Sequence, residues 1–218
     1  MRPPPQLPAH PGLLVTRTDR VWDGRFPLDV VHFRTRRFDG AQSGPRVWEL
    51  WRRGPAAALL PYDPWADSVL LIEQFRLPVL AAGLDPVLVE LPAGLCDAGE
   101  DAETAARRET AEETGLTPDL LAPIGRVMLS PGGTDECCAS FAGRVRIPSA
   151  GPDGLLGDGV IGIGGLPAEE EDIRLRVWPA PAAIARALDG GFPNALTMLA
   201  LLWLGARRAT LRAEWSTR

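Results

Sequence analysis

Residues 13–52 alternate apolar and polar side chains in short bursts, as in Leu28–Phe33 and Val47–Trp51. Turn-forming glycines separate these bursts, at Gly24, Gly40 and Gly44. A period of two predicts half-buried strands, here a small antiparallel sheet. A sheet with so little apolar surface cannot be stable alone, so it must pack against something else.

A different pattern follows, in which apolar runs are continuous. Ala56–Pro61 and Ser68–Gln74 flank a turn at Tyr62–Ala66, which predicts a hairpin whose two strands are buried on both faces. Further strands are expected at Leu88–Leu91, Ile124–Leu129, Cys137–Val145 and Arg174–Trp178.

Helical patterns occupy three segments. The stretch 100–114 is rich in Ala, Arg and Glu and contains neither proline nor glycine. Ala180–Leu188 is expected to form a short helix. Asn194–Arg212 is expected to form an amphipathic helix with Asn194 as its N-cap. Residues 149–167 hold many Gly and Pro and are expected to form the longest loop. Strands dominate and a few helices pack on them, so the fold class is α+β.

Composition limits the kind of protein. The chain has 218 residues, is 45% hydrophobic and carries a formal net charge of −5, which argues against nucleic-acid binding. The longest apolar run, Leu196–Leu204, is too short to span a membrane. Residues 1–12 form a proline-rich stretch without a signal-peptide core, expected to be disordered, and three cysteines make no disulfide framework. A cytoplasmic protein is expected.

A cluster of glutamates in the middle of the chain points to specific chemistry. Glu109, Glu112 and Glu113 lie at i, i+3 and i+4 of the segment 100–114, so in a helix their carboxylates share one face. Like charges repel unless a cation compensates them, and hard divalent cations prefer carboxylate oxygen. The alternative is an ordinary solvated acidic face. The three glutamates alone leave both interpretations open, and the longer skeleton that contains them favours the magnesium site.

These glutamates belong to a longer skeleton. It comprises Gly94, Glu100, Arg108–Glu109, Glu112–Glu113 and Gly115–Leu116. At this spacing the segment resembles the signature box of the Nudix hydrolases, which cleave nucleoside diphosphates linked to a second group. Thr110 departs from the family pattern, which usually has an aliphatic residue there, and a slight packing change is expected without loss of chemistry.

The resemblance implies a Nudix fold of mixed β-sheets sandwiched by helices, and Mg²⁺ as the cofactor, with Mn²⁺ as an alternative. Arg108 is expected to hold the helix and the preceding loop together through Glu100, a structural role. The implied metal ligands are the backbone carbonyl of Ala93 and the carboxylates of Glu109, Glu112, Glu113 and Glu171.

Two later loops narrow the resemblance to the subgroup that hydrolyses ADP-ribose. Ser130–Glu136 resembles its substrate loop, with Gly132, Gly133 and Asp135 as substrate-binding residues; consecutive glycines let backbone N–H groups approach a phosphate or ribose. Alone, Pro-Gly-Gly is an ordinary turn. The acidic stretch Glu169–Asp172 resembles the loop that supplies the late catalytic glutamate.

The register of that acidic loop matches Glu171 to the catalytic position and Glu169 to a second acidic one, and Glu113 completes the expected catalytic set. Which loop glutamate accepts the proton stays open, with Glu171 favoured. Without the resemblance, the loop would be a solvated acidic tip.

Four residues match ligand contacts of the same subgroup: Phe26, Arg53, Arg76 and Glu90. Arginine suits a pyrophosphate because its guanidinium binds phosphate bidentately. In the subgroup the aromatic residue stacks on adenine and comes from the partner subunit. The resemblance therefore implies a homodimer in which residues 13–53 form a swapped β domain and residues 54–218 the hydrolase domain.

The expected activity is hydrolysis of ADP-ribose to AMP and ribose 5-phosphate, with no nucleic-acid or membrane partner. Two alternatives stay open: another nucleoside diphosphate sugar such as GDP-mannose, or a non-catalytic nucleotide sensor. Sensors of this fold usually lack one or more box carboxylates, and this chain has all of them.

Overall fold

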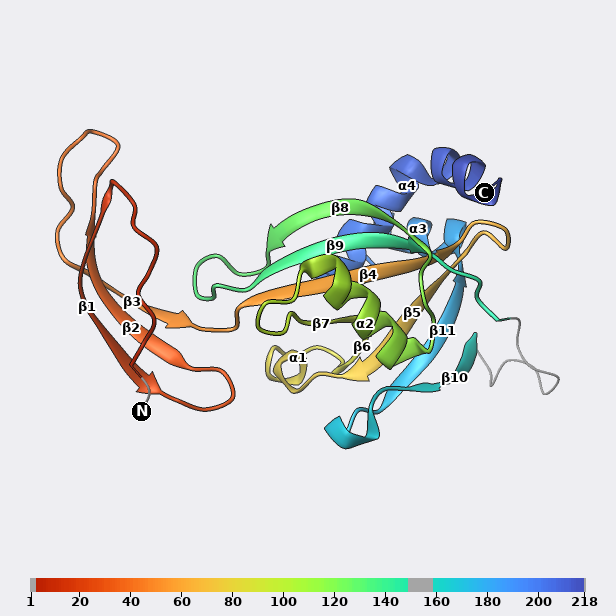
Figure 1. The fold of residues 1–218 in the computed structure, drawn as a ribbon, viewed down its shortest axis with the longest axis horizontal. Helices are drawn as coiled ribbons and strands as arrows, with labels where there is room; N and C mark the ends of the chain where they lie inside the picture. Colours follow the sequence, from red (N-terminus) through yellow and green to blue (C-terminus); the bar gives the residue numbers. More distant parts are fainter. Residues whose placement is uncertain (1–2, 149–158, 218) are drawn as a thin grey trace. The chain divides into compact units, whose positions relative to one another are not determined.

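The computed structural model describes residues 3–148 and 159–217 (Figure 1). The chain divides into two compact units. The first contains the residues up to Pro55 together with Met128–Cys137, and the second contains Ala56–Val127 and the residues from Cys138 onward. Of the loop expected at 149–167, residues 149–158 lie outside the described part.

The first unit contains the predicted antiparallel sheet. Strands β1 (Leu13–Trp22), β2 (Leu28–Thr35) and β3 (Arg46–Trp51) pair in the order β1-β2-β3. The segment Met128–Cys137 joins this sheet through Trp51, whose amide donates to the carbonyl of Gly133 at 2.8 Å. The small antiparallel sheet is therefore confirmed, and the segment Met128–Cys137 extends it.

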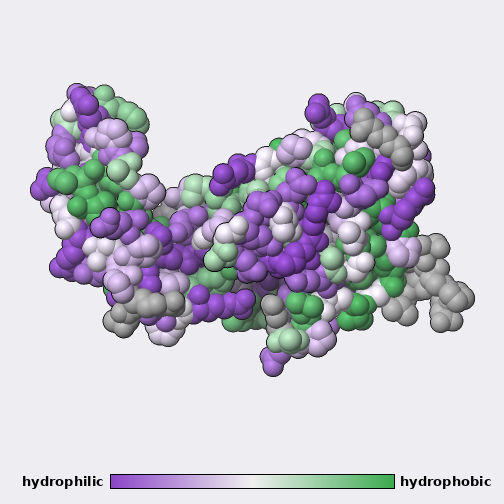
Figure 2. All heavy atoms as spheres, in the orientation of Figure 1, coloured by the Kyte–Doolittle hydropathy of each residue, from purple (hydrophilic) through white to green (hydrophobic). Residues whose placement is uncertain are grey.

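The apolar surface of this unit is only partly covered. Val31 and Phe33 are buried, whereas Trp48 is 53% exposed although its ring makes an edge contact with Phe33 at 5.3 Å. Figure 2 shows hydrophobic residues at the surface of this unit. A cavity of about 210 Å³ opens among mainly apolar side chains, including Leu7 and Leu13. The expectation that the sheet buries little apolar surface agrees with this packing.

The second unit is built on an eight-stranded sheet. Its main path runs β10-β11-β5-β4-β9-β8, while β6 pairs with β5 and β7 pairs with β4. The strands are β4 (Pro55–Asp63), β5 (Ser68–Phe75), β6 (Val87–Glu90), β7 (Ala93–Leu95), β8 (Leu120–Met128), β9 (Cys137–Arg144), β10 (Val160–Gly164) and β11 (Ile173–Pro179).

Helices cover both faces of this sheet. They are α1 (Leu77–Ala81), α2 (Ala102–Thr114), α3 (Ala180–Leu188) and α4 (Ala195–Ser216), with a short 3-10 helix, η1, at Pro167–Glu169. None of the helices within the described ranges combines the length and apolar character needed to cross a membrane.

The alternation of side chains in β4 separates two cores. Ala57 and Leu59 pack with Ala105 and Ala106 of α2. The even-numbered side chains of the same strand pack with residues of α3 and α4. Because successive side chains point to opposite faces, a strand covered on both sides needs a continuous apolar run. The sandwich of helices around a sheet is therefore confirmed, with the α+β fold class.

Several details differ from the sequence-based expectations: β8 begins at Leu120 rather than Ile124, and neither α1 nor β7 was expected. The helix expected from Glu100 begins at Ala102, because Asp101 is its N-cap. Residues 160–164, expected in a loop, form β10, and α4 continues to Ser216 rather than ending at Arg212. Gly162 and Gly164 explain why the sequence did not predict this strand, since glycine normally weakens strands.

Candidate active site

Helix α2 carries most of the expected acidic side chains, and its two ends are well defined. The Asp101 carboxylate accepts from the amides of Glu103 and Thr104, both at 3.0 Å. Gly115 ends the helix with φ of 70°, a left-handed conformation that favours glycine. These caps define where the helix begins and ends, and hence which of its side chains share a face.

Thr110, the departure from the family pattern, is fully buried in α2. Its hydroxyl donates to the carbonyl of Ala106 at 2.7 Å. The polar atom is therefore satisfied within the helix, while the methyl group packs in the core. This agrees with the expectation of little disturbance at this position.

The segment before α2 contains β6 and β7, which pair with β5 and β4 where those two strands separate. Strands β4 and β5 pair directly only near their turn, at Tyr62–Val69 and Asp63–Ser68. Beyond it, β6 pairs with β5 and β7 pairs with β4, which sets Glu90 opposite Ile72. Glu90 therefore lies at the end of β6, and Ala93 and Gly94 lie at the start of β7, in the region where β4 and β5 separate.

Gly94 provides the space that Glu109 occupies. A β-carbon built on Gly94 would lie 2.0 Å from Oε1 of Glu109 and 2.1 Å from its carboxyl carbon. No side chain can replace the hydrogen there without moving the glutamate. The glycine at this position of the skeleton is therefore a steric requirement of the Glu109 carboxylate, which is 15 positions away in the sequence but adjacent in space.

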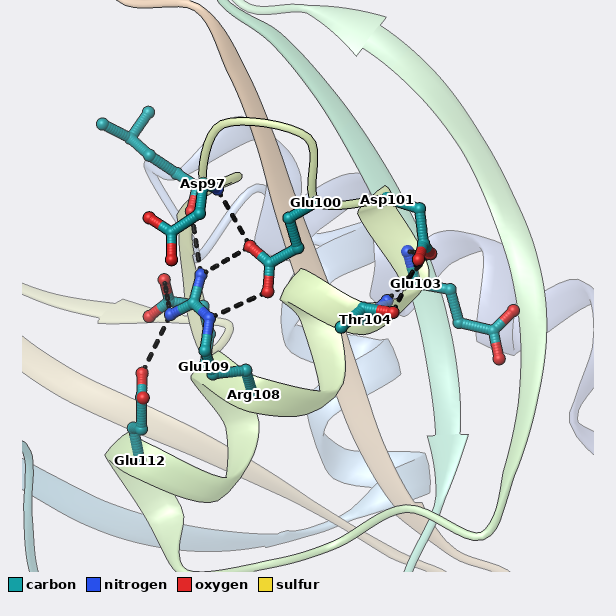
Figure 3. A network of polar contacts seen from close by, with 9 residues as sticks. Asp97, Glu100, Asp101, Glu103, Thr104, Arg108, Glu109 and Glu112 are labelled. Atoms are coloured by element: carbon teal, nitrogen blue, oxygen red, sulfur yellow. Dashed lines mark hydrogen bonds and ion pairs between the residues drawn. The ribbon is translucent and has the colours of Figure 1, made fainter.

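Arg108 organises the acidic groups around it (Figure 3). It forms a bidentate pair with Glu100, Nε to Oε1 at 3.0 Å and Nη2 to Oε2 at 2.9 Å, and Nη2 also donates to the carbonyl of Leu95. Its Nη1 donates to Glu109 at 2.8 Å and to Glu112 at 3.0 Å. The expected link to Glu100 is present, and Arg108 also partly offsets the charges of Glu109 and Glu112.

Glu113 is the most buried of these acids, with 2% of its surface exposed. Its Oε2 accepts from the amide of Ala93 at 3.0 Å. The pKa of Glu113 is raised to about 8, mainly by burial; the nearby charges of Glu171 and Glu109 also raise it, and the Ala93 amide lowers it. Burial also raises the pKa of Glu109, against the lowering effect of Arg108. Negative charge here is costly without a compensating cation.

Glu171 reaches this cluster from the loop between β10 and β11. Its Oε2 accepts from the amide of Leu166 at 3.0 Å, which folds the loop back on itself. Its charge raises the pKa of both Glu109 and Glu113, so it lies within electrostatic reach of them. Glu169 belongs to η1, and its side chain lies outside the described part of the structure.

The donor set suits a hard divalent cation. The carboxylates of Glu109, Glu113 and Glu171 lie close enough for their charges to shift the pKa values of Glu109 and Glu113. Hard divalent cations prefer oxygen ligands of this kind. Within residues 3–148 and 159–217, no group of three or more His, Cys, Asp or Glu side chains is already arranged to enclose a metal ion. In this arrangement Arg108 and the Ala93 amide engage the glutamates that a cation would bind.

Arg76 and Glu90 meet near the same cluster. Nε and Nη2 of Arg76 contact Oε2 of Glu90 at 2.8 and 2.7 Å. Arg76 is also among the charges that lower the pKa of Glu113. The structure therefore brings two of the expected ligand contacts together beside the α2 carboxylates.

The remaining expected contacts belong to the first unit. Arg53 lies over the Phe26 ring at 4.5 Å and over the Trp51 ring at 4.9 Å, and its Nε pairs with Glu136 at 2.5 Å. Cation–π contacts of this kind hold a guanidinium against an aromatic face. Phe26 and Arg53 are therefore brought together, with Trp51 as a third member that the sequence did not single out.

The Ser130–Glu136 loop is fastened to the same unit. The carboxylate of Asp135 accepts from the amides of Arg53 and Gly54 at 2.7 and 3.1 Å, and it also pairs with Arg52. Gly132 and Gly133 have open space where a β-carbon would lie, and both line the apolar cavity. Asp135 thus has a structural role here, and the substrate contacts of this loop stay a prediction.

Comparisons with known proteins agree with this geometry. The NUDIX domain family matches residues 52–193. The chain belongs to the Nudix family. It is 36% identical to an ADP-ribose pyrophosphatase of Escherichia coli K12 over 219 residues, covering 99% of this chain and 100% of that protein.

Other relatives of this Nudix chain have related activities. An ADP-ribose pyrophosphatase of Haemophilus influenzae is 35% identical over 89% of the chain and 87% of its own length. A GDP-mannose pyrophosphatase of Yersinia pestis is 33% identical over 75% of the chain and 77% of its own. The crystal structure of an ADP compounds hydrolase has the same fold, with a TM-score of 0.62 and 21% identity over 92% of the chain and 98% of its own.

Sequence reasoning missed two features of this Nudix site. One is the contact of Arg108 with Glu109 and Glu112, for which the i, i+4 spacing of Arg108 and Glu112 is the available signal. The other is a hydrogen bond from Asn194 to Glu90, 104 positions apart in the sequence. No local pattern indicates that second contact.

Proposed function

We propose that this Nudix hydrolase cleaves the pyrophosphate bond of ADP-ribose to give AMP and ribose 5-phosphate. The observation that carries the proposal is the convergence of Glu171 on Glu109 and Glu113. Three acidic groups held against one another and partly buried need a positive ligand, and the magnesium complex of a pyrophosphate supplies one. The near full-length similarity to an ADP-ribose pyrophosphatase supports the choice of substrate.

The proposed cofactor is Mg²⁺, for which Mn²⁺ is an alternative. Glu109, Glu112, Glu113, Glu171 and the carbonyl of Ala93 would hold it. When bound, the cation offsets charge on the phosphate oxygens and makes water a better nucleophile at neutral pH.

The chain itself supplies the rest of the reaction. Water attacks one phosphorus, the bridging P–O bond breaks, and the proton of the water passes to a loop carboxylate, for which Glu171 is our choice over Glu169. Glu171 suits this role because the Leu166 amide holds its carboxylate within reach of the α2 acids. Arg76 supplies positive charge for the phosphates beside the same acids.

A panel of nucleotide sugars tests the substrate. With Mg²⁺ present, we expect ADP-ribose to give the highest kcat/KM, with AMP and ribose 5-phosphate as the products. GDP-mannose is the principal competitor, because a GDP-mannose pyrophosphatase is among the relatives. A clear preference for GDP-mannose would overturn the choice of substrate. Thermal stabilisation by ADP-ribose without turnover would instead indicate a nucleotide sensor.

The proposed assembly is a cytoplasmic homodimer in which the N-terminal unit of one subunit contributes Phe26 and Arg53 to the site of the other. Its support is the surface of that unit, where Trp22 is 63% and Trp48 53% exposed. Large exposed apolar side chains often mark a protein interface. All three cysteines are free, as in proteins of reducing compartments.

A further inference from the structure

Asn194 lies at the start of α4 and makes two kinds of hydrogen bond. Its Oδ1 accepts from the amide of Thr197 at 3.0 Å, which is the N-cap bond expected from the sequence. Its Nδ2 donates to Oε1 of Glu90 at 2.9 Å. The second bond points away from the helix, toward β6.

The direction of the Asn194 amide follows from its partners. A backbone N–H can only donate, and an ionised carboxylate can only accept. The oxygen must therefore face Thr197 and the nitrogen must face Glu90, because the reversed amide would place donor against donor and acceptor against acceptor. Aspartate or serine would cap the helix equally well, but neither offers this donor.

Glu90 is almost completely buried, with 8% of its side chain exposed, and both of its oxygens have partners. Oε1 accepts from Asn194, and Oε2 faces Nε and Nη2 of Arg76. The contacts with Asn194 and Arg76 together fix the orientation of the carboxylate, with one oxygen toward each residue. Arg76 in turn is 40% exposed, so part of its guanidinium stays available to a ligand.

The cap of α4 is fixed to the sheet as well as to Glu90. The hydroxyl of Thr197 lies 3.2 Å from Oδ1 of Asn194 and 3.5 Å from the carbonyl of Val89, and Thr197 is fully buried. The end of α4 is thus anchored on β6, the strand that carries Glu90. This anchoring gives Asn194 a fixed place from which to orient the carboxylate.

We propose that Asn194 is a positioning residue for substrate binding, which orients Glu90 and through it Arg76 toward the pyrophosphate and ribose of ADP-ribose. The inference rests on the proposed function. A side chain needed only to cap α4 would affect stability alone. A positioning residue must affect the affinity for substrate even when the helix stays capped.

Three substitutions separate these roles. Asn194→Ser keeps a capping side chain but is too short and has no amide to reach Glu90. Asn194→Asp keeps the shape and the cap, and opposes Glu90 with a like charge. Asn194→Ala removes cap and contact together. We expect Asn194→Ser to lower the melting temperature less than Asn194→Ala, because the cap is kept, and to raise KM for ADP-ribose about tenfold, as for one lost charged hydrogen bond, with kcat within about threefold.

Asn194→Asp should raise KM at least as much, and Asn194→Ala should also lower the melting temperature. The decisive comparison repeats Asn194→Ser on a Glu90→Gln background, where the serine should change KM little further. A wild-type KM in Asn194→Ser, or the same rise in KM on both backgrounds, would overturn the positioning role.

Calorimetric titration with ADP-ribose, without added divalent cation, keeps this inference separate from the proposed activity. Wild-type protein that binds ADP-ribose in this titration but does not hydrolyse it once Mg²⁺ is added overturns the proposed function, while the ratio of Kd between Asn194→Ser and wild type still decides the role of Asn194. Wild-type protein that neither binds nor hydrolyses ADP-ribose overturns both.

Discussion

The carboxylate of Glu109 lies in the space that a side chain at Gly94 would occupy, 2.0 Å from an ideal β-carbon. The two residues are 15 positions apart in the sequence and belong to β7 and α2. The contact explains in steric terms why a glycine opens the acidic skeleton. It also couples the placement of a strand to the direction of a glutamate that we expect to bind metal.

Gly94→Ala should therefore displace Glu109. We expect kcat to fall by about 100-fold or more, since a misplaced ligand disturbs a preorganised site, and the protein to lose about 1–3 kcal/mol of stability through overpacking. Activity assays and urea unfolding measure the two effects. Gly44→Ala is the matched control, because its β-carbon meets open space and its backbone is unstrained. Normal activity in Gly94→Ala would show that Glu109 has another position during turnover.

Substitution of Arg108 should affect stability and the Mg²⁺ requirement far more than substitution of its neighbour Arg107. Arg108→Gln removes the bidentate pair with Glu100 and the contacts to Leu95, Glu109 and Glu112, at a cost of about 1–3 kcal/mol in unfolding free energy. It also leaves the acidic cluster less compensated, so more Mg²⁺ should be needed for half-maximal activity.

Arg107→Gln is the control for that variant. Arg107 contacts the exposed Glu103 and the carbonyl of Pro118 on another side of α2. We expect it to lose at most about 1 kcal/mol and to keep the Mg²⁺ requirement of the wild type. Equal effects of the two substitutions on the Mg²⁺ requirement would contradict the role of Arg108 in the acidic cluster.

The metal-free protein should lose stability as the pH rises from about 5 to about 8, because of the raised pKa of Glu113. The pKa of this carboxyl is about 8 in the folded protein and lies above its ordinary value, mainly because of burial. The folded chain therefore keeps a proton that the unfolded chain has already released, and this contribution falls between about pH 5 and pH 8. Thermal melts with a chelator measure the slope.

Two further measurements identify Glu113 as its source. Glu113→Gln should flatten the slope, because the amide does not titrate. Mg²⁺ should raise the melting temperature more at about pH 8 than at about pH 5, since protons compete with the cation for the carboxylates. A pH-independent effect of Mg²⁺ would contradict binding at this cluster.

The strands and helices that pack in the core could largely be predicted from the sequence. The uninterrupted apolar run of β4 required cover on both faces, and Asp101, Gly115 and Asn194 mark helix ends by their own chemistry. Local patterns were insufficient for α1, which has five residues and none buried, and for the glycine-rich strand β10. Residues 160–164 form a strand because they pair with β11, and their own sequence does not reveal that pairing.

For the site, the skeleton predicted the acids and the pair of Arg108 with Glu100, but not the other partners of these acids. The spacing of Glu109, Glu112 and Glu113 predicted a shared helix face, whereas the position of Arg108 between the carboxylates depends on side-chain rotamers. The bond from Asn194 to Glu90 depends on where α4 begins on β6. Such contacts arise from tertiary packing, so the sequence pattern does not contain them.

Deleting the residues before Gly54 tests the proposed dimer. We expect the shortened protein to be monomeric and inactive, because Phe26 and Arg53 are lost together with the sheet of the first unit. Sedimentation velocity and ADP-ribose hydrolysis measure the two effects. Phe26→Ala in the full chain is the milder companion, expected to raise KM while the dimer persists. A fully active monomeric truncation would refute the swapped arrangement.

Glu113→Gln, compared with Glu103→Gln, tests the central claim most directly. Both substitutions exchange a carboxylate for an amide on α2, but Glu103 is exposed and pairs only with Arg107 among the contacts described for its side chain. The measurement is Mg²⁺-dependent release of AMP from ADP-ribose by folded protein. The account predicts near wild-type kcat for Glu103→Gln and a loss of about 100-fold or more for Glu113→Gln. Near-normal turnover in Glu113→Gln, with AMP still formed, would contradict it.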